Sequence, residues 1–154
     1  MTTLDRRTLL AAAAAAAVLP LGARAATPAI HVAKGTGCDC CVLWTDYLRA
    51  EGFEVTEEEL YGMQLIVFKQ ERGVPGPLAS CHTGVIEGYF VEGHVPAADI
   101  RRLLAERPDA AGIAVPGMPY GSPGMGPETE REAYDVLLVG RDGASRVFTS
   151  YPAA

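Results

Sequence analysis

Three of the four cysteines in the chain lie in one short segment, Gly-Thr-Gly-Cys-Asp-Cys-Cys at positions 35–41. The apolar run at 30–34 predicts a strand, and apolar residues at helical spacing over 41–50 predict an amphipathic helix. The cysteines therefore fall on a strand-to-helix turn. Unsatisfied N–H groups and the helix dipole at such a turn favour thiolate over thiol. Because thiolates are both nucleophiles and soft-metal ligands, this turn predicts redox chemistry or metal binding.

The spacing of the cysteines argues against a purely structural role. Cys38 and Cys41 form a C-x-x-C pair, and Cys40 adds a third sulfur that a simple dithiol redox site does not need. A disulfide between the neighbours Cys40 and Cys41 is strained, and only Cys81 lies far enough along the chain to link distant segments. Two structural disulfides remain the alternative for an exported protein.

The first 25 residues have the pattern of an export signal. Arg6 and Arg7 precede an alanine-rich apolar run, and positions 23–25 match the small-x-small cleavage pattern. The apolar run is too short to span a bilayer and no cysteine follows the cleavage site directly, so we expect no stable membrane anchor. We therefore expect a signal peptide over 1–25 and a single mature domain over 26–154 in the periplasm.

The arginine pair and the net charge bear on the route of export and on partners. The pair is typical of the twin-arginine route, and the general secretory route is an equal alternative. The leader carries three arginines and one aspartate, a net +2, so the whole-chain charge of −6 becomes −8 in the mature protein. This acidity argues against nucleic acid and anionic lipid surfaces as partners.

The remaining apolar patterns predict a single α/β domain. We expect a strand at 53–56, a helix at 60–72, a hairpin of strands at 83–86 and 89–92, and a helix at 96–107. The stretch 65–68 is also compatible with a buried strand. The predicted order, β-α-β-α-β-β-α, is that of the thioredoxin-like fold, in which a C-x-x-C occupies the first strand-to-helix turn. Proline and glycine at 112–127 predict a loop with no regular element, and 134–139 with 145–151 predict a C-terminal β-hairpin.

Four motifs occur in order along the chain: CDCC at 38–41 with Trp44, SCHT at 80–83, EGHVP at 92–96, and VPGMPYGSPGM at 115–125. Together they resemble the CopG-type periplasmic copper-binding family, long catalogued as a domain of unknown function. The resemblance extends over about residues 30–151. It implies an exported thioredoxin-like domain that binds copper through cysteines and takes part in copper resistance. Its expected partners are copper ions and other periplasmic copper-handling proteins.

Ligand chemistry selects the candidate metal-binding residues. Copper(I) is soft and prefers thiolate and thioether sulfur, with imidazole also accepted, while zinc is the alternative for a set of four cysteines. A histidine in a turn before a helix is easy to present, and methionines in a proline- and glycine-rich loop have no periodic pattern that would bury them. The expected copper ligands are Cys38, Cys40, Cys41, Cys81, His94, Met118 and Met125.

Other residues of the same types have a structural reading. His82 would point away from the site if Cys81 began a straight strand, so ligation and a structural role are equally compatible with the sequence. We expect His31, Trp44 and Met63 to serve the fold, with Trp44 also able to cover the metal.

Two functions follow. The first is a copper-binding protein of copper resistance that sequesters or passes copper, with Cu(I)/Cu(II) redox cycling as an extension. The second is a thiol-disulfide oxidoreductase that uses Cys38 and Cys41. Any enzymatic activity would accordingly be that of a copper or thiol oxidoreductase.

Overall fold

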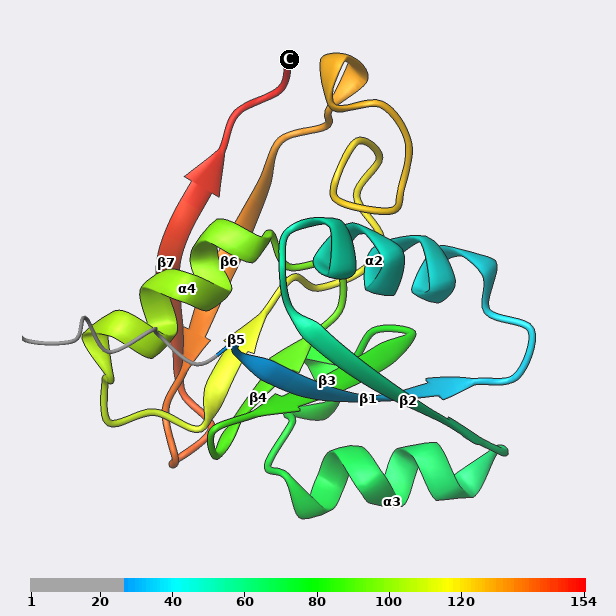
Figure 1. Cartoon of the computed structure of the whole chain (residues 1–154). Helices are drawn as coiled ribbons and strands as arrows, with labels where there is room; N and C mark the ends of the chain where they lie inside the picture. The colour runs from blue at the N-terminus through cyan, green and yellow to red at the C-terminus, as the bar shows by residue number, and fades with distance from the viewer. Residues whose placement is uncertain (1–26) are drawn as a thin grey trace, which may run out of the picture.

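The computed structural model of the protein describes residues 27–154, so the expected signal peptide at 1–25 lies outside the described residues. A seven-stranded mixed sheet organises the chain (Figure 1). Its strands are β1 (Ala29–Gly35), β2 (Glu54–Leu60), β3 (His82–Ile86), β4 (Tyr89–Glu92), β5 (Gly112–Ala114), β6 (Tyr134–Val139) and β7 (Ser145–Tyr151), in the spatial order β2-β1-β3-β4-β5-β6-β7. Neighbours pair antiparallel except β1 with β2 and β4 with β5, which are parallel.

Helices cover both faces of this sheet. They are α2 (Asp39–Ala50), α3 (Met63–Glu71) and α4 (Ala97–Glu106), with short 3-10 turns at Gly76–Leu78 and Glu128–Glu130. Figure 1 shows α2 and α3 on opposite sides of the sheet. Between residues 27 and 154, no helix combines the length and apolar character needed to cross a membrane.

The main core lies on the α2 side. Trp44 and Leu48 of α2 and Ile100 and Leu103 of α4 pack in one cluster with alternate strand residues such as Ile113. Successive strand residues point to opposite faces, which places a smaller cluster on the other side of the sheet. That cluster consists of Val74, Phe90, Ala114 and Val139.

The α/β class and the expected elements up to residue 107 are confirmed, and 65–68 belongs to a helix rather than a strand. The expected C-terminal hairpin is formed by β6 and β7. The second strand is longer than expected and extends to Leu60, because it pairs with β1 along its whole length.

Two expectations were wrong. Residues 112–127 are not free of regular structure, since Gly112–Ala114 form β5 between β4 and β6. Three residues are too few to show a pattern in the sequence, and Gly112 fits because a side chain there would strike the carbonyl and ring of Phe90. Met63 does not lie in the core: it is 68% exposed at the start of α3, whose apolar residues do not gather on one face.

Candidate metal site

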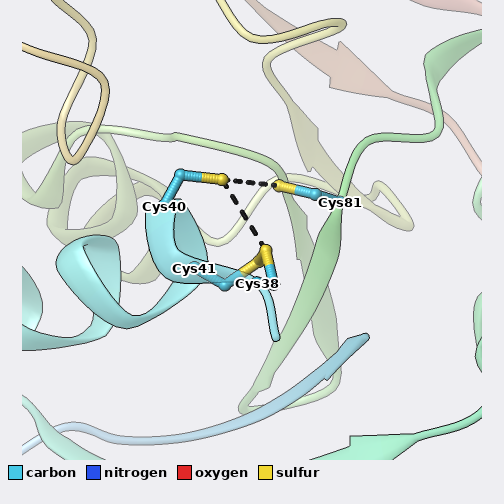
Figure 2. A group of neighbouring side chains, drawn as sticks. All are labelled: Cys38, Cys40, Cys41 and Cys81. Carbon is cyan, nitrogen blue, oxygen red and sulfur yellow. Dashed lines mark hydrogen bonds between the residues drawn. A yellow bond between two sulfur atoms is a disulfide. The ribbon is translucent and has the colours of Figure 1, made fainter. Parts of the chain in front are cut away.

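The sheet order brings the four cysteines together from two segments. Cys38 is the N-cap of α2, and Cys40 and Cys41 lie in its first turn. Cys81 directly precedes β3, which pairs with β1, so the end of β1 and the start of β3 are neighbours. The four sulfur atoms lie within 4.8 Å of one another (Figure 2). All four cysteines that the sequence analysis names as copper ligands therefore lie in one cluster.

The cysteines differ in redox state. Cys38 and Cys41 form a disulfide, while Cys40 and Cys81 are free thiols. The Cys40 sulfur lies 3.6 Å from that of Cys38 and 3.8 Å from that of Cys81. In this oxidised form two thiols are available, and reduction of the disulfide supplies two more within the same cluster.

Two buried imidazoles contact the sulfur of Cys81. Nδ1 of His82 is 3.3 Å and Nε2 of His94 is 3.4 Å from the Cys81 sulfur. The three donor atoms form a second potential metal-binding group that shares Cys81 with the cysteine cluster. The sequence left the role of His82 open. A bend at Cys81, immediately before the strand begins, turns the His82 side chain toward the sulfur rather than away from it.

The hydrogen bonds of the two imidazoles bear on metal binding. Nδ1 of His94 lies 2.9 Å from the carbonyl oxygen of Pro123. A carbonyl only accepts, so Nδ1 carries the proton and the lone pair of Nε2 faces Cys81. Nε2 of His82 is the one buried side-chain nitrogen or oxygen within residues 27–154 that has no hydrogen-bond partner. A buried polar atom without a partner requires an explanation, and a bound ion or water molecule is one.

Burial controls protonation at the site. It raises the pKa of the Cys81 thiol to about 11, with the neighbouring Cys40 adding to the effect. It also lowers the pKa of His94, and it lowers that of His82 well below its usual value, with the charges of His94 and Lys69 contributing. The histidines are therefore neutral at pH 7, as metal ligands must be. The Cys81 thiol keeps its proton until a metal displaces it.

Trp44 closes the apolar side of the site. Its side chain is fully buried, which confirms its expected place in the core, and its Nε1 donates to the carbonyl oxygen of Val95 at 2.9 Å. Its ring also lies 4.3 Å from the His82 ring, centroid to centroid. Trp44 therefore serves the core and walls the site together.

The loop that follows β5 runs over the site. Ser80 Oγ, beside Cys81, donates to the carbonyl oxygen of Gly117 at 2.8 Å, and His94 bonds to Pro123. Gly124 packs against the first turns of α2. A Cβ atom at this position would come within 3.1 Å of the carbonyl oxygen of Cys40 and within 2.8 Å of the backbone nitrogen of Trp44. Only a residue without a side chain permits this approach.

The two loop methionines sit differently. Met118 is 55% exposed and, with Pro116 and Glu132, lines a surface cavity of about 480 Å³. Met125 is half-buried, and its backbone N–H closes a turn onto Ser122. The sequence placed both methionines in the loop near the site, and their part in metal binding remains a proposal.

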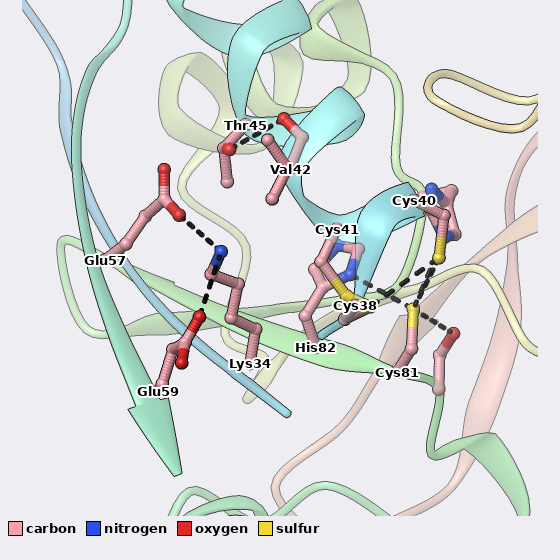
Figure 3. Close-up of a disulfide and its surroundings, with 12 residues drawn as sticks. Lys34, Cys38, Cys40, Cys41, Val42, Thr45, Glu57, Glu59, Cys81 and His82 are labelled. Atoms are coloured by element: carbon pink, nitrogen blue, oxygen red, sulfur yellow. Dashed lines mark hydrogen bonds and ion pairs between the residues drawn. A yellow bond between two sulfur atoms is a disulfide. The ribbon is translucent and has the colours of Figure 1, made fainter. Parts of the chain in front are cut away.

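Acidic residues neutralise a buried lysine on the strand beside the site. Lys34 pairs with His82 across β1 and β3, and its ammonium is mostly buried. Glu57 lies 2.9 Å and Glu59 3.8 Å from that ammonium, on either side of it (Figure 3). His31, expected to be structural, bonds to Thr56 and Glu58 of β2 instead of joining the cysteines.

The donor set suits a soft metal ion. Its members are sulfur and neutral imidazole nitrogen, and carboxylate oxygens are absent from both groups of potential ligands in residues 27–154. Copper(I) prefers such donors, whereas magnesium and calcium require oxygen. The cysteines, His82 and His94 therefore fit copper chemically.

Two solved structures are similar to this chain over most of its length. One, titled "Copper resistance protein copG- Form 1", is 49% identical with a TM-score of 0.75 and covers 81% of this chain and 98% of its own. The other, titled Form 2, is 48% identical with a TM-score of 0.75 and covers 82% and 99%. A family model described as a protein of unknown function, DUF411, matches residues 78–125, which include Cys81, His82 and His94. No curated protein sequence gave a significant match.

Proposed function

The chain belongs to the CopG family of copper resistance proteins, and on that basis we propose that it binds copper in the periplasm through its cysteine cluster. The observation that carries the proposal is the convergence of four sulfurs and two neutral imidazoles on one site. In the reduced protein, the ligands would be Cys38, Cys40, Cys41 and Cys81 together with His94. His82 would be a further ligand, because its Nδ1 lies 3.3 Å from the Cys81 sulfur.

The proposal extends to the loop methionines, to copper redox cycling and to export. Met118 and Met125 would add thioether sulfur, which needs no deprotonation and so acts even in acid. A copper ion would supply one-electron chemistry at this site, and the acid-stable donors would hold it. Export by a signal peptide over 1–25 would deliver the domain 26–154 to the periplasm.

We also infer a thioredoxin-like topology for the first seven elements. In support, β2, β1, β3 and β4 are adjacent in that order, with β1 and β2 parallel and β3 antiparallel to both its neighbours. Helices α2 and α3 lie on opposite faces, and the C-x-x-C pair begins α2. The strands β5, β6 and β7 would then extend this unit at one edge.

A second function, thiol-disulfide oxidoreductase, has one specific observation in its favour. Cys38 and Cys41 form a disulfide at the N-terminus of a helix, which is where dithiol oxidoreductases carry theirs. For this function Cys40 and Cys81 would not be needed. The two functions therefore make opposite demands on these two free thiols.

Metal analysis and X-ray absorption on protein purified from the periplasm, reduced and copper-replete, test the first function. We expect copper with sulfur and nitrogen neighbours. Cys38→Ser/Cys41→Ser should lose most of the copper, and Cys81→Ser should lower its affinity or stoichiometry. His94→Gln should weaken binding, while His31→Gln, a histidine outside the site, serves as the matched control and should not.

An insulin-reduction assay separates the alternatives. The copper-binding proposal predicts little turnover. Efficient insulin reduction, together with copper binding that ignores the loss of Cys40 or Cys81, would decide for the oxidoreductase.

A further inference from the structure

A buried ion pair lies on the α3 face of the sheet, directly behind the segments that carry the metal donors. Lys69 of α3 and Glu92 of β4 are 7% and 0% exposed, and Nζ of Lys69 lies 2.6 Å from Oε1 of Glu92. Lys69 also donates to the hydroxyl of Thr83 at 2.8 Å. Pairs of this kind seldom stabilise a fold more than apolar residues of similar size would, because desolvating two charges is costly. Stability alone is therefore a weak explanation for this pair.

Glu92 holds both sides of the Cys81–His82 dipeptide. Its Oε1 accepts from the backbone N–H of Ser80 at 2.5 Å, and its Oε2 accepts from the Thr83 hydroxyl at 2.6 Å. Cys81 and His82 lie between these two anchors, so one carboxylate fixes the bend that turns both side chains to the site.

The same residue leads into the third donor. His94 follows Glu92 by two residues, and the intervening Gly93 donates its N–H to the carbonyl oxygen of His82 at 3.2 Å. A side chain at Gly93 would strike the carbonyl of Val115 and the side chain of Ser80, so these segments are packed without spare room. A displacement of the Glu92 side chain would therefore shift the positions of Cys81, His82 and His94.

We propose that Glu92 is a positioning residue for the copper site, which sets the Cys81 bend through the Ser80 N–H, with Lys69 compensating its charge. This inference rests on the proposed copper function. Glu92 would not contact the metal, because its carboxylate accepts hydrogen bonds from Ser80, Thr83 and Lys69.

Two double variants isolate the hydrogen bond from the charge. Lys69→Met/Glu92→Gln and Lys69→Met/Glu92→Met both remove the ion pair and are both neutral. Only the glutamine retains an oxygen that accepts from the Ser80 N–H. The comparison between them therefore reports the loss of that acceptor and not the loss of a buried charge.

The readouts are hydrogen exchange of the Ser80 amide in the metal-free reduced protein and Cu(I) affinity in competition with a colorimetric chelator. We expect the glutamine variant to stay within about threefold of wild type in both, and the methionine variant to lose about 10–100-fold in affinity. Its Ser80 amide should exchange at least roughly tenfold faster. Equal exchange or equal Cu(I) affinity in the two variants would overturn the proposal.

Two provisions keep the test decisive. If the methionine variant fails to fold, Glu92→Asp replaces it in the test. Aspartate keeps the negative charge but is shorter by one methylene, so its carboxylate lies farther from the Ser80 N–H. A Ser80 exchange rate and a Cu(I) affinity equal to those of the wild type in Glu92→Asp would refute the positioning role. If wild-type protein binds no copper, the proposed function fails, and Ser80 exchange still decides whether Glu92 holds the bend.

Discussion

The close approach of Gly124 to α2 gives the sharpest test of the loop that covers the site. Gly124 has φ +83°, and a Cβ atom there would lie 2.8 Å from the backbone nitrogen of Trp44 and 3.1 Å from the carbonyl oxygen of Cys40. Gly143, in the turn between β6 and β7, has nearly the same φ of +81° but nothing within 4 Å of its Cβ position. Gly143→Ala is therefore a matched control for Gly124→Ala.

The two substitutions share a backbone cost and differ in contact. An alanine held at positive φ costs about 1–2 kcal/mol at either position. Forcing an extra methyl against packed atoms costs about 1–3 kcal/mol more, and only position 124 has such atoms. We expect Gly143→Ala to lower the free energy of unfolding by about 1–2 kcal/mol and Gly124→Ala by about 2–5 kcal/mol.

The site should respond to only one of them. Lifting the loop at Gly124 moves the Pro123 carbonyl away from Nδ1 of His94, which loses the partner that orients its ring. Loss of such an outer partner lowers metal affinity about 10–100-fold. Urea unfolding of the metal-free reduced proteins and Cu(I) competition measure the two effects. Equal stability losses in the two variants, with Cu(I) affinity unchanged in Gly124→Ala, would refute the reasoning.

Three further predictions concern the loop methionines, a buried tyrosine and the leader. Met118→Leu/Met125→Leu should leave folding intact but weaken copper retention, more at pH 5 than at pH 7; equal Cu(I) affinity across that range would indicate simple packing. Burial raises the pKa of Tyr134 to about 12 in the folded protein. As pH rises above about 10, this tyrosine therefore loses its proton in the unfolded chain before it does so in the folded protein. The free energy of unfolding should therefore fall as pH rises from about 10 to 12, and Tyr134→Phe should make that fall shallower in urea titrations. Mass spectrometry of the exported protein should find Ala26 as its first residue, whereas an intact Met1 on most molecules would contradict a cleaved leader.

The local elements around the site were accessible from the sequence alone. The strand, turn and helix that carry the cysteines appear in the periodicity of neighbouring residues, as do the hairpin after Cys81 and the helix after His94. Backbone preference and apolar spacing act over three or four positions, so a sequence pattern reports them directly. The choice of sulfur donors also followed from residue type, because ligand softness belongs to the side chain and not to the fold.

The tertiary structure decided the distances and contacts that depend on the order of strands in the sheet. Cys40 and Cys81, 41 positions apart, meet because β1 lies beside β3. His82 joins them because of a bend that alternation along a straight strand does not foresee.

The same holds for single groups whose surroundings come from remote parts of the chain. The orientation of His94 depends on a backbone carbonyl 29 positions away, a group that every residue carries and that no sequence pattern can single out. β5 is a strand only because β4 and β6 each offer it a free edge. Contacts of this kind are set by sheet order and by the path of a loop, and these are properties of the folded chain as a whole.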